Sequence, residues 1–85
     1  MHKTTVRFWK CYNNLPEKIK KISKRNFDLL GINSLHPSLH FKKVGKFWSI
    51  RISDYYRALA VKKDDDYIWL WIGNHNDYDE MIKKT

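Results

Sequence analysis

Arg51, Arg57 and His75 have the side-chain types that could bind and cleave a phosphodiester. They lie within or at the end of a stretch, Phe47 to His75, that concentrates aromatic and β-branched residues. Arginine can hold two phosphate oxygens at once, and an imidazole with a pKa of about 6.5 can take up or release a proton near neutral pH. Cleavage of RNA through its own 2′-hydroxyl needs a base, an acid and cationic stabilisation, but no metal. We therefore expect these three side chains to meet on one face of a sheet. In the alternative interpretation His75 is structural and the arginines pair with nearby Asp54 or Asp77.

Other candidates for chemistry are few. Cys11 is the single cysteine, which excludes an intramolecular disulfide, and it falls on an expected core face, where a thiol is a poor nucleophile. His36 and His40 have a metal-like spacing, but Pro37 between them opposes a helix and no third ligand is near. Asp64, Asp65 and Asp66 are expected to form a solvated turn. We therefore expect no metal and no cofactor.

Three strands must position the candidate residues. Polar and apolar residues alternate through Phe47–Ile52, and aromatic and aliphatic residues dominate Tyr56–Val61 and Tyr67–Ile72, which predicts three strands, the third with two apolar faces. Ser53-Asp54 and the charged run 62–66 predict the two connecting turns. In the third strand the same alternation places Ile68, Leu70 and Ile72 on one face and Tyr67, Trp69 and Trp71 on the other.

Helices are expected on both sides of this region. Thr4 and Thr5 can cap a first helix that carries Phe8, Cys11, Tyr12 and Leu15 on one face, with a strand over residues 5–8 as the competing prediction. A second, basic helix begins at Leu15-Pro16-Glu17 and stops near Gly31. Residues 32–46 read as loop, and residues 74–84 as a short helix. The predicted fold is α+β: an N-terminal helical hairpin packed on a small three- to four-stranded antiparallel sheet with a short C-terminal helix, in one domain over residues 1–85.

The charge of the chain is strongly asymmetric. The net charge is +8, and the first 46 residues hold eleven Lys/Arg against two acidic residues. A basic half-molecule favours a polyanionic partner such as RNA or DNA, or an acidic protein. The sequence has neither an apolar run of membrane-spanning length nor a signal-peptide pattern, so we expect a cytoplasmic protein without a membrane partner.

Taken in order, the segments HPSLHFKK, WSIRISDYYRALAV and IWLWIGNHNDYDEMI resemble the RelE/ParE toxin superfamily of bacterial type II toxin–antitoxin modules, in particular its cytotoxic translational repressor branch. The resemblance covers the whole chain. It implies a compact sheet wrapped by a helical hairpin, and a cognate antitoxin as partner. Many members cut mRNA in the ribosomal A site, whereas ParE-like members inhibit DNA gyrase.

The resemblance also implies site residues. The arginine of the family's second strand matches Arg57, a basic residue of the first strand matches Arg51, and the position after the third strand is His75. Tyr78 is the nearest counterpart of a tyrosine in the last helix, and Ser49 stands where related nucleases have a second cation. The acidic residues Asp77, Asp79 and Glu80 replace basic ones, so we expect them to repel RNA.

The first hypothesis is therefore a ribosome-dependent, metal-independent mRNA endonuclease with His75, Arg57, Arg51 and Tyr78 as catalytic residues. Its alternatives are a gyrase inhibitor of the ParE kind and a non-toxic protein that only binds an antitoxin. The expected RNA-binding residues are the cations of the loop before the first strand and of the basic helix: Lys42, Lys43, Lys46, Lys20, Lys24 and Arg25.

Overall fold

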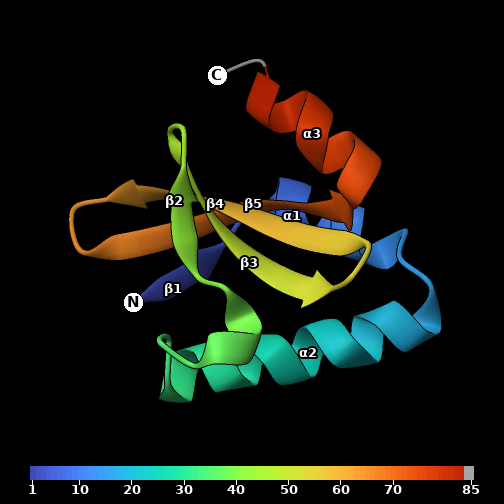
Figure 1. Ribbon diagram of the computed structural model, residues 1–85, viewed down its shortest axis with the longest axis horizontal. Coiled ribbons are helices and arrows are strands. Elements are labelled where there is room, and N and C mark those ends of the chain that lie inside the picture. Colours follow the sequence, from blue (N-terminus) through green and yellow to red (C-terminus); the bar gives the residue numbers. More distant parts are fainter. Residues whose placement is uncertain (84–85) are drawn as a thin grey trace.

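The computed structural model describes residues 1–83, which form a five-stranded sheet flanked by helices (Figure 1). In chain order the elements are β1 (His2–Thr4), α1 (Val6–Asn13), α2 (Glu17–Ile32), the 3₁₀ turn η1 (Pro37–Leu39), β2 (Lys42–Val44), β3 (Phe47–Ser53), β4 (Tyr56–Lys63), β5 (Asp66–Asn74) and α3 (His75–Lys83). The strand order is β1-β5-β4-β3-β2. Even α2, the longest of the described helices, is too short and too polar to span a membrane.

The predicted α+β class is confirmed, but the strand count is not, because the sheet has five strands rather than three or four. The additional strands, β1 and β2, are three residues each, which is too short to show an alternating pattern. β1 runs parallel to β5, with His2 opposite Tyr67, so its partner lies at the far end of the chain. The competing prediction of a strand over residues 5–8 is wrong, since α1 begins at Val6.

The helix signals read from the sequence are largely confirmed. Thr5 is the N-cap of α1, and its hydroxyl accepts a hydrogen bond from the Phe8 amide at 3.1 Å. Pro16 immediately precedes α2. Gly31, which we expected to stop this helix, instead lies in its last turn, and Asn33 is the C-cap. The helix therefore continues one residue beyond the glycine, to Ile32, whose side chain is exposed.

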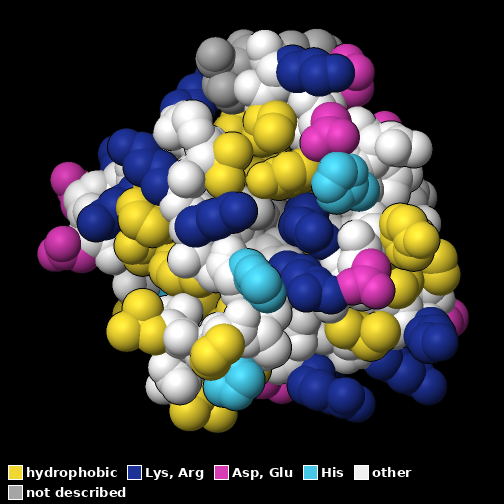
Figure 2. Space-filling view, viewed as in Figure 1, with side chains coloured by type: hydrophobic (Ala, Val, Ile, Leu, Met, Phe, Trp, Pro, Cys, Tyr) yellow, Lys and Arg dark blue, Asp and Glu magenta, His cyan; other side chains and the backbone are white. Residues whose placement is uncertain are grey.

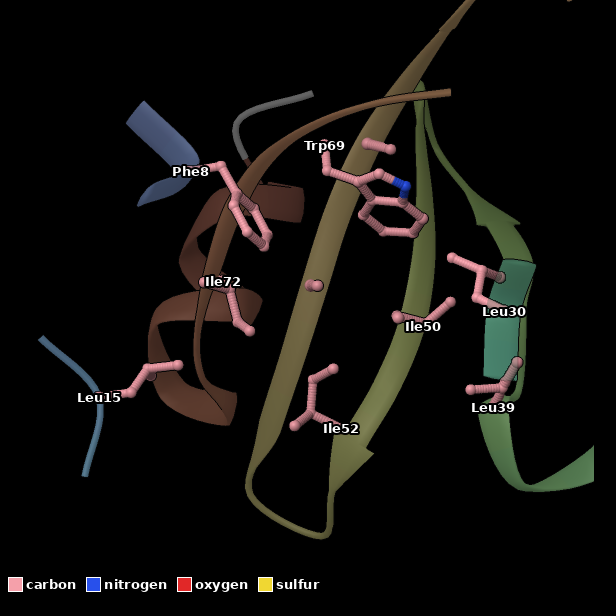
Figure 3. Close-up of a cluster of buried hydrophobic side chains, with 10 residues drawn as sticks. Phe8, Leu15, Leu30, Leu39, Ile50, Ile52, Trp69 and Ile72 are labelled. Atoms are coloured by element: carbon pink, nitrogen blue, oxygen red, sulfur yellow. The ribbon is translucent and has the colours of Figure 1, made fainter. Parts of the chain in front are cut away.

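Each face of the sheet carries its own apolar cluster. The larger one packs α1 and α2 against the sheet, and Figure 3 shows its side chains converging between these layers: Phe8, Leu15, Leu30, Leu39, Ile50, Ile52, Trp69 and Ile72. The smaller one packs α3 on the opposite face through Phe47, Leu59, Trp71 and Tyr78.

The predicted faces of β5 are wrong from Trp71 onward. The β4–β5 register shifts between Leu59, which lies opposite Trp71, and Ala60, which lies opposite Trp69. This β-bulge places one extra residue in β5 and reverses the alternation beyond it. Ile72 therefore joins Trp69 in the larger cluster, and Trp71 packs beneath α3.

Candidate functional site

The α3 side of the sheet contains a cleft of about 200 Å³ whose lining is polar and basic. Figure 2 shows lysine, arginine and histidine side chains gathered around a hollow on this side of the molecule. The cleft is lined by residues from five different parts of the chain: His40, Lys42, Ser49, Arg51, Arg57, His75 and Tyr78. Three permanent cations and two imidazoles face this cleft, and its lining contains no carboxylate among the described residues.

Strand register brings the two arginines together. Arg51 of β3 lies directly opposite Arg57 of β4, and Arg57 lies opposite Gly73 of β5. His75 follows β5 at the start of α3. The prediction that Arg51, Arg57 and His75 share one face is thus confirmed, although their roles in chemistry stay a prediction.

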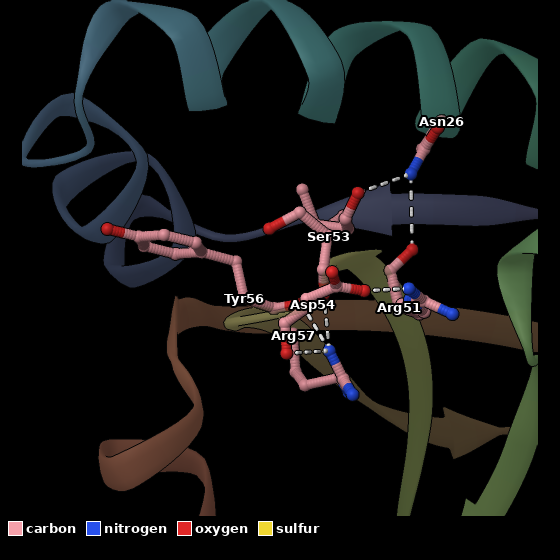
Figure 4. A network of polar contacts seen from close by, with 7 residues as sticks. Asn26, Arg51, Ser53, Asp54, Tyr56 and Arg57 are labelled. Carbon is pink, nitrogen blue, oxygen red and sulfur yellow. Dashed lines mark hydrogen bonds and ion pairs between the residues drawn. The ribbon is translucent and has the colours of Figure 1, made fainter.

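A second β-bulge is what makes the arginines opposite one another. Ser53 pairs with Tyr56, so a regular hairpin would place Arg51 opposite Ala58; the register instead shifts between Arg51 and Ser53. The Asn26 side chain of α2 stabilises this irregularity, because its Nδ2 donates to the carbonyls of Arg51 and Ile52 at 3.1 and 3.0 Å (Figure 4).

The β3–β4 turn holds both guanidinium groups. Arg57 Nη1 donates to the carbonyl oxygens of Ser53 at 2.6 Å and Tyr56 at 2.9 Å, which anchors the side chain to the backbone (Figure 4). Arg51 forms an ion pair with the Asp54 carboxylate. The alternative we considered for Arg51, pairing with Asp54, therefore exists in this structure, while the guanidinium still lines the cleft.

His75 is oriented from within α3. Its Nδ1 lies 3.3 Å from Asp79 Oδ2, one helical turn away, and both side chains are partly exposed. An Nδ1–H donated to a carboxylate leaves Nε2 as the free nitrogen of the ring. The centroid of the Tyr78 ring lies 5.8 Å from that of His75. Tyr78 is 92% buried, so packing restricts its position at the edge of the cleft.

The acidic residues of α3, which we expect to repel RNA, do not line the cleft. Asp79 contacts His75, and Glu80 lies 3.9 Å from Lys83. The amide of Asp77 donates to Asn74 Oδ1 at 2.8 Å, and its side chain borders a different cavity beside α1. Around the helix axis Asp79 lies about 160° from Asp77, so these two carboxylates point to opposite sides of α3.

The six predicted RNA-binding cations are not brought together. Lys42 lines the cleft. Lys43 and Lys46 lie on or beside β2 but are not part of the cleft lining, and the Lys46 ammonium lies 5.5 Å from the Phe47 ring centroid. Lys20, Lys24 and Arg25 belong to α2, which covers the opposite face of the sheet. RNA contact by all six stays a prediction.

Sequence reasoning missed His40 as a cleft residue. It directly follows η1 and has a left-handed backbone (φ 47°, ψ 45°), a conformation in which histidine is enriched relative to most residues. This turn directs the chain from η1 into β2, so that His40 and Lys42 reach the same cleft. The only available signal was the position of His40 two residues before Lys42. Residues 1–83 contain no group of three or more His, Cys, Asp or Glu side chains that could hold a metal ion.

The sequence matches no protein-family model and no curated protein. The fold, in contrast, is similar to that of solved structures. They include the RelB–RelE antitoxin–toxin complex from Methanococcus jannaschii (TM-score 0.73, 20% identity, 93% of this chain and 96% of that chain). YafQ from E. coli gives a TM-score of 0.69 at 14% identity over 92% of this chain and 96% of that chain. The archaeal RelE–RelB complex from Pyrococcus horikoshii gives 0.60 at 20% identity over 86% and 91%.

These similarities define the class: the chain has the fold of the RelE-like toxins. The resemblance to the RelE/ParE superfamily that the sequence segments carried is confirmed at the level of the fold.

Proposed function

We propose that this protein is the toxin of a type II toxin–antitoxin module and that it cleaves mRNA on the ribosome without a metal ion. The observation that carries the proposal is the cleft, in which Lys42, Arg51 and Arg57 surround two imidazoles. Such a set is complementary to a phosphodiester and supplies groups for proton transfer. The fold shared with RelE structures supports the toxin role.

The chemistry follows from the positions of these groups. The 2′-hydroxyl oxygen attacks the adjacent phosphorus and releases its proton to a base, and the bond from phosphorus to the 5′-oxygen breaks as an acid protonates the leaving oxygen. The products are a 2′,3′-cyclic phosphate and a 5′-hydroxyl. His75 is our candidate for one proton-transfer role through its free Nε2, and His40 for the other.

The cations and Tyr78 complete the proposed site. Arg57 is anchored to backbone carbonyls, so it can stabilise the pentacoordinate phosphorus with little loss of side-chain entropy. Arg51 and Lys42 add positive charge on the β3 side of the cleft. Tyr78 packs beside His75 and limits its movement. A cognate antitoxin is the proposed protein partner, because two of the similar structures are complexes of RelE with RelB.

The test is induced expression in bacteria with mapping of mRNA 5′ ends. We expect growth arrest with cleavage inside translated codons, and we expect both effects to be lost in His75→Ala and Arg57→Ala. Lys21→Ala is the matched control, since it removes an exposed cation from α2 and should leave cleavage unchanged. If growth stops without new mRNA ends, and His75→Ala still arrests growth, the nuclease proposal is wrong.

One feature of the cleft favours a second candidate, a protein that binds without cleaving. Ser49, which is 2% exposed, stands where the resemblance implies a second cation in related nucleases, so this cleft has one positive charge fewer than theirs. Such a protein would inhibit gyrase or only bind an antitoxin. Loss of DNA supercoiling activity in the presence of the purified protein would establish gyrase inhibition, whereas unaffected supercoiling with no growth arrest would leave antitoxin binding alone.

A further inference from the structure

Asp54 neutralises one of the two arginines of the cleft. It lies in the turn between β3 and β4, and its carboxylate pairs with Arg51 three residues earlier in the chain. The Asp54 side chain is 76% exposed and that of Arg51 is 37% exposed, so the pair lies at the protein surface. Asp54 is not part of the cleft lining itself. A dissolved anion can therefore reach Arg51 from the cleft while Asp54 holds it from the turn.

The register explains why a counterion is needed here. Side chains of directly opposed residues in an antiparallel pair lie about 4.5–5.5 Å apart at Cβ, and like charges in such pairs are destabilising. Arg51 and Arg57 are opposed in this way. Arg57 is bonded only to carbonyl oxygens within the described residues, so Asp54 supplies the one negative charge that offsets the repulsion between the two guanidinium groups.

We propose that Asp54 is a specificity-determining residue that occupies Arg51 in place of a substrate phosphate, so that the cleft selects anions able to engage Arg51 and Arg57 together. This inference rests on the proposed function and specifies how its substrate is chosen. A phosphate has several oxygens and can bridge the two guanidinium groups. A simple carboxylate can only exchange with Asp54 on Arg51, and Asp54 is held nearby by the chain, which gives it a high effective concentration.

The direct experiment is titration of the purified protein with inorganic phosphate and, separately, with acetate, at constant pH and ionic strength. Binding is followed through the Nε–H resonances of Arg51 and Arg57. An exposed ion pair contributes up to about 1 kcal/mol, which corresponds to roughly a fivefold change in affinity. We therefore expect Asp54→Asn to tighten acetate binding by up to about fivefold and phosphate binding by a smaller factor of about twofold, so that the preference for phosphate falls.

Two controls make this result specific to the contact. Asp64→Asn removes the same charge from the turn between β4 and β5, at a left-handed position that asparagine tolerates, and should change neither affinity. In an Arg51→Ala background, Asp54→Asn should no longer tighten phosphate binding. The inference is overturned if Asp54→Asn leaves phosphate affinity unchanged or weakens it, if Asp64→Asn gives the same gain, if the gain persists without Arg51, or if acetate gains no more than phosphate.

The outcome is separable from that of the mRNA-cleavage test. If the phosphate and acetate titrations behave as expected but mRNA is not cut, the cleft is an anion site with the selectivity inferred above and the nuclease proposal fails. If mRNA is cut but Asp54→Asn changes no affinity, the nuclease proposal stands and the role of Asp54 is refuted.

Discussion

Replacing Gly73 by alanine should destabilise the protein through a single added methyl group. A Cβ built at this position lies 2.5 Å from Cζ2 of Trp71, and 3.1 Å from both Cε2 and Cη2 of the same ring. Carbon atoms in contact prefer a separation of about 3.5–4.0 Å, so the ring must move by an ångström or more. Trp71 and Gly73 are two residues apart in the regular part of β5, so they face the same side of the sheet and the Trp71 ring lies against the glycine.

The ring has little room to move. Trp71 is 7% exposed and packs against Phe47, Leu59 and Tyr78. Overpacking of a filled core costs about 1–3 kcal/mol, and we expect the free energy of unfolding to fall by that amount. Because Tyr78 also lines the cleft, the same displacement should lower the mRNA cleavage that we propose for this protein.

Urea unfolding followed by circular dichroism measures the effect, and Gly31→Ala is the matched control. Gly31 lies in the last turn of α2, where an added Cβ meets no atom within 4 Å. Alanine there should raise the free energy of unfolding by about 0.5–1 kcal/mol, because glycine is the poorer helix former. The reasoning is refuted if Gly73→Ala is as stable as the wild-type protein, or if the two substitutions shift stability in the same direction.

Two further predictions concern contacts outside the cleft. Trp69 Nε1–H donates to His2 Nδ1 at 3.0 Å, and burial, followed by the nearby N-terminal ammonium, lowers the pKa of His2 from its ordinary value of about 6.5. The contribution of His2 to stability should therefore be complete above about pH 6.5 and be lost as the pH falls below that value, because the unfolded chain takes up the proton first. Unfolding curves of the wild-type protein and of His2→Phe, measured between about pH 5 and 8, would show this loss. If the stabilities of the two proteins change in parallel with pH, the prediction is contradicted. Asn26→Ala should lower the free energy of unfolding by about 1–3 kcal/mol, since it leaves the carbonyls at the β3 bulge without their donor. The control is Asn76→Ala, which removes the same side chain from an exposed position. Equal urea midpoints for the two variants would refute the role of Asn26.

Much of the fold could be read from local patterns. β3, β4 and β5 follow one another along the chain with short turns, so alternation and turn residues were enough to predict them. Thr5 was recognisable as a cap for the same reason, because the hydroxyl and the amide that it accepts from are only three residues apart. β1 could not be found in this way, since its three residues gain strand structure only by pairing with β5, more than sixty residues later.

The candidate site, too, was predictable from the sequence only where it depends on local patterns. The sequence by itself determined that Arg51, Arg57 and His75 would lie in or beside three consecutive strands, because side-chain alternation is a property of each strand alone. The tertiary structure decided that the two arginines face each other, since this depends on a bulge in β3 that Asn26 of a distant helix stabilises. It also decided that His40 reaches the cleft and that the acidic residues of α3 do not line it. Bulges and packed helix orientations depend on contacts between remote segments, which no local pattern encodes.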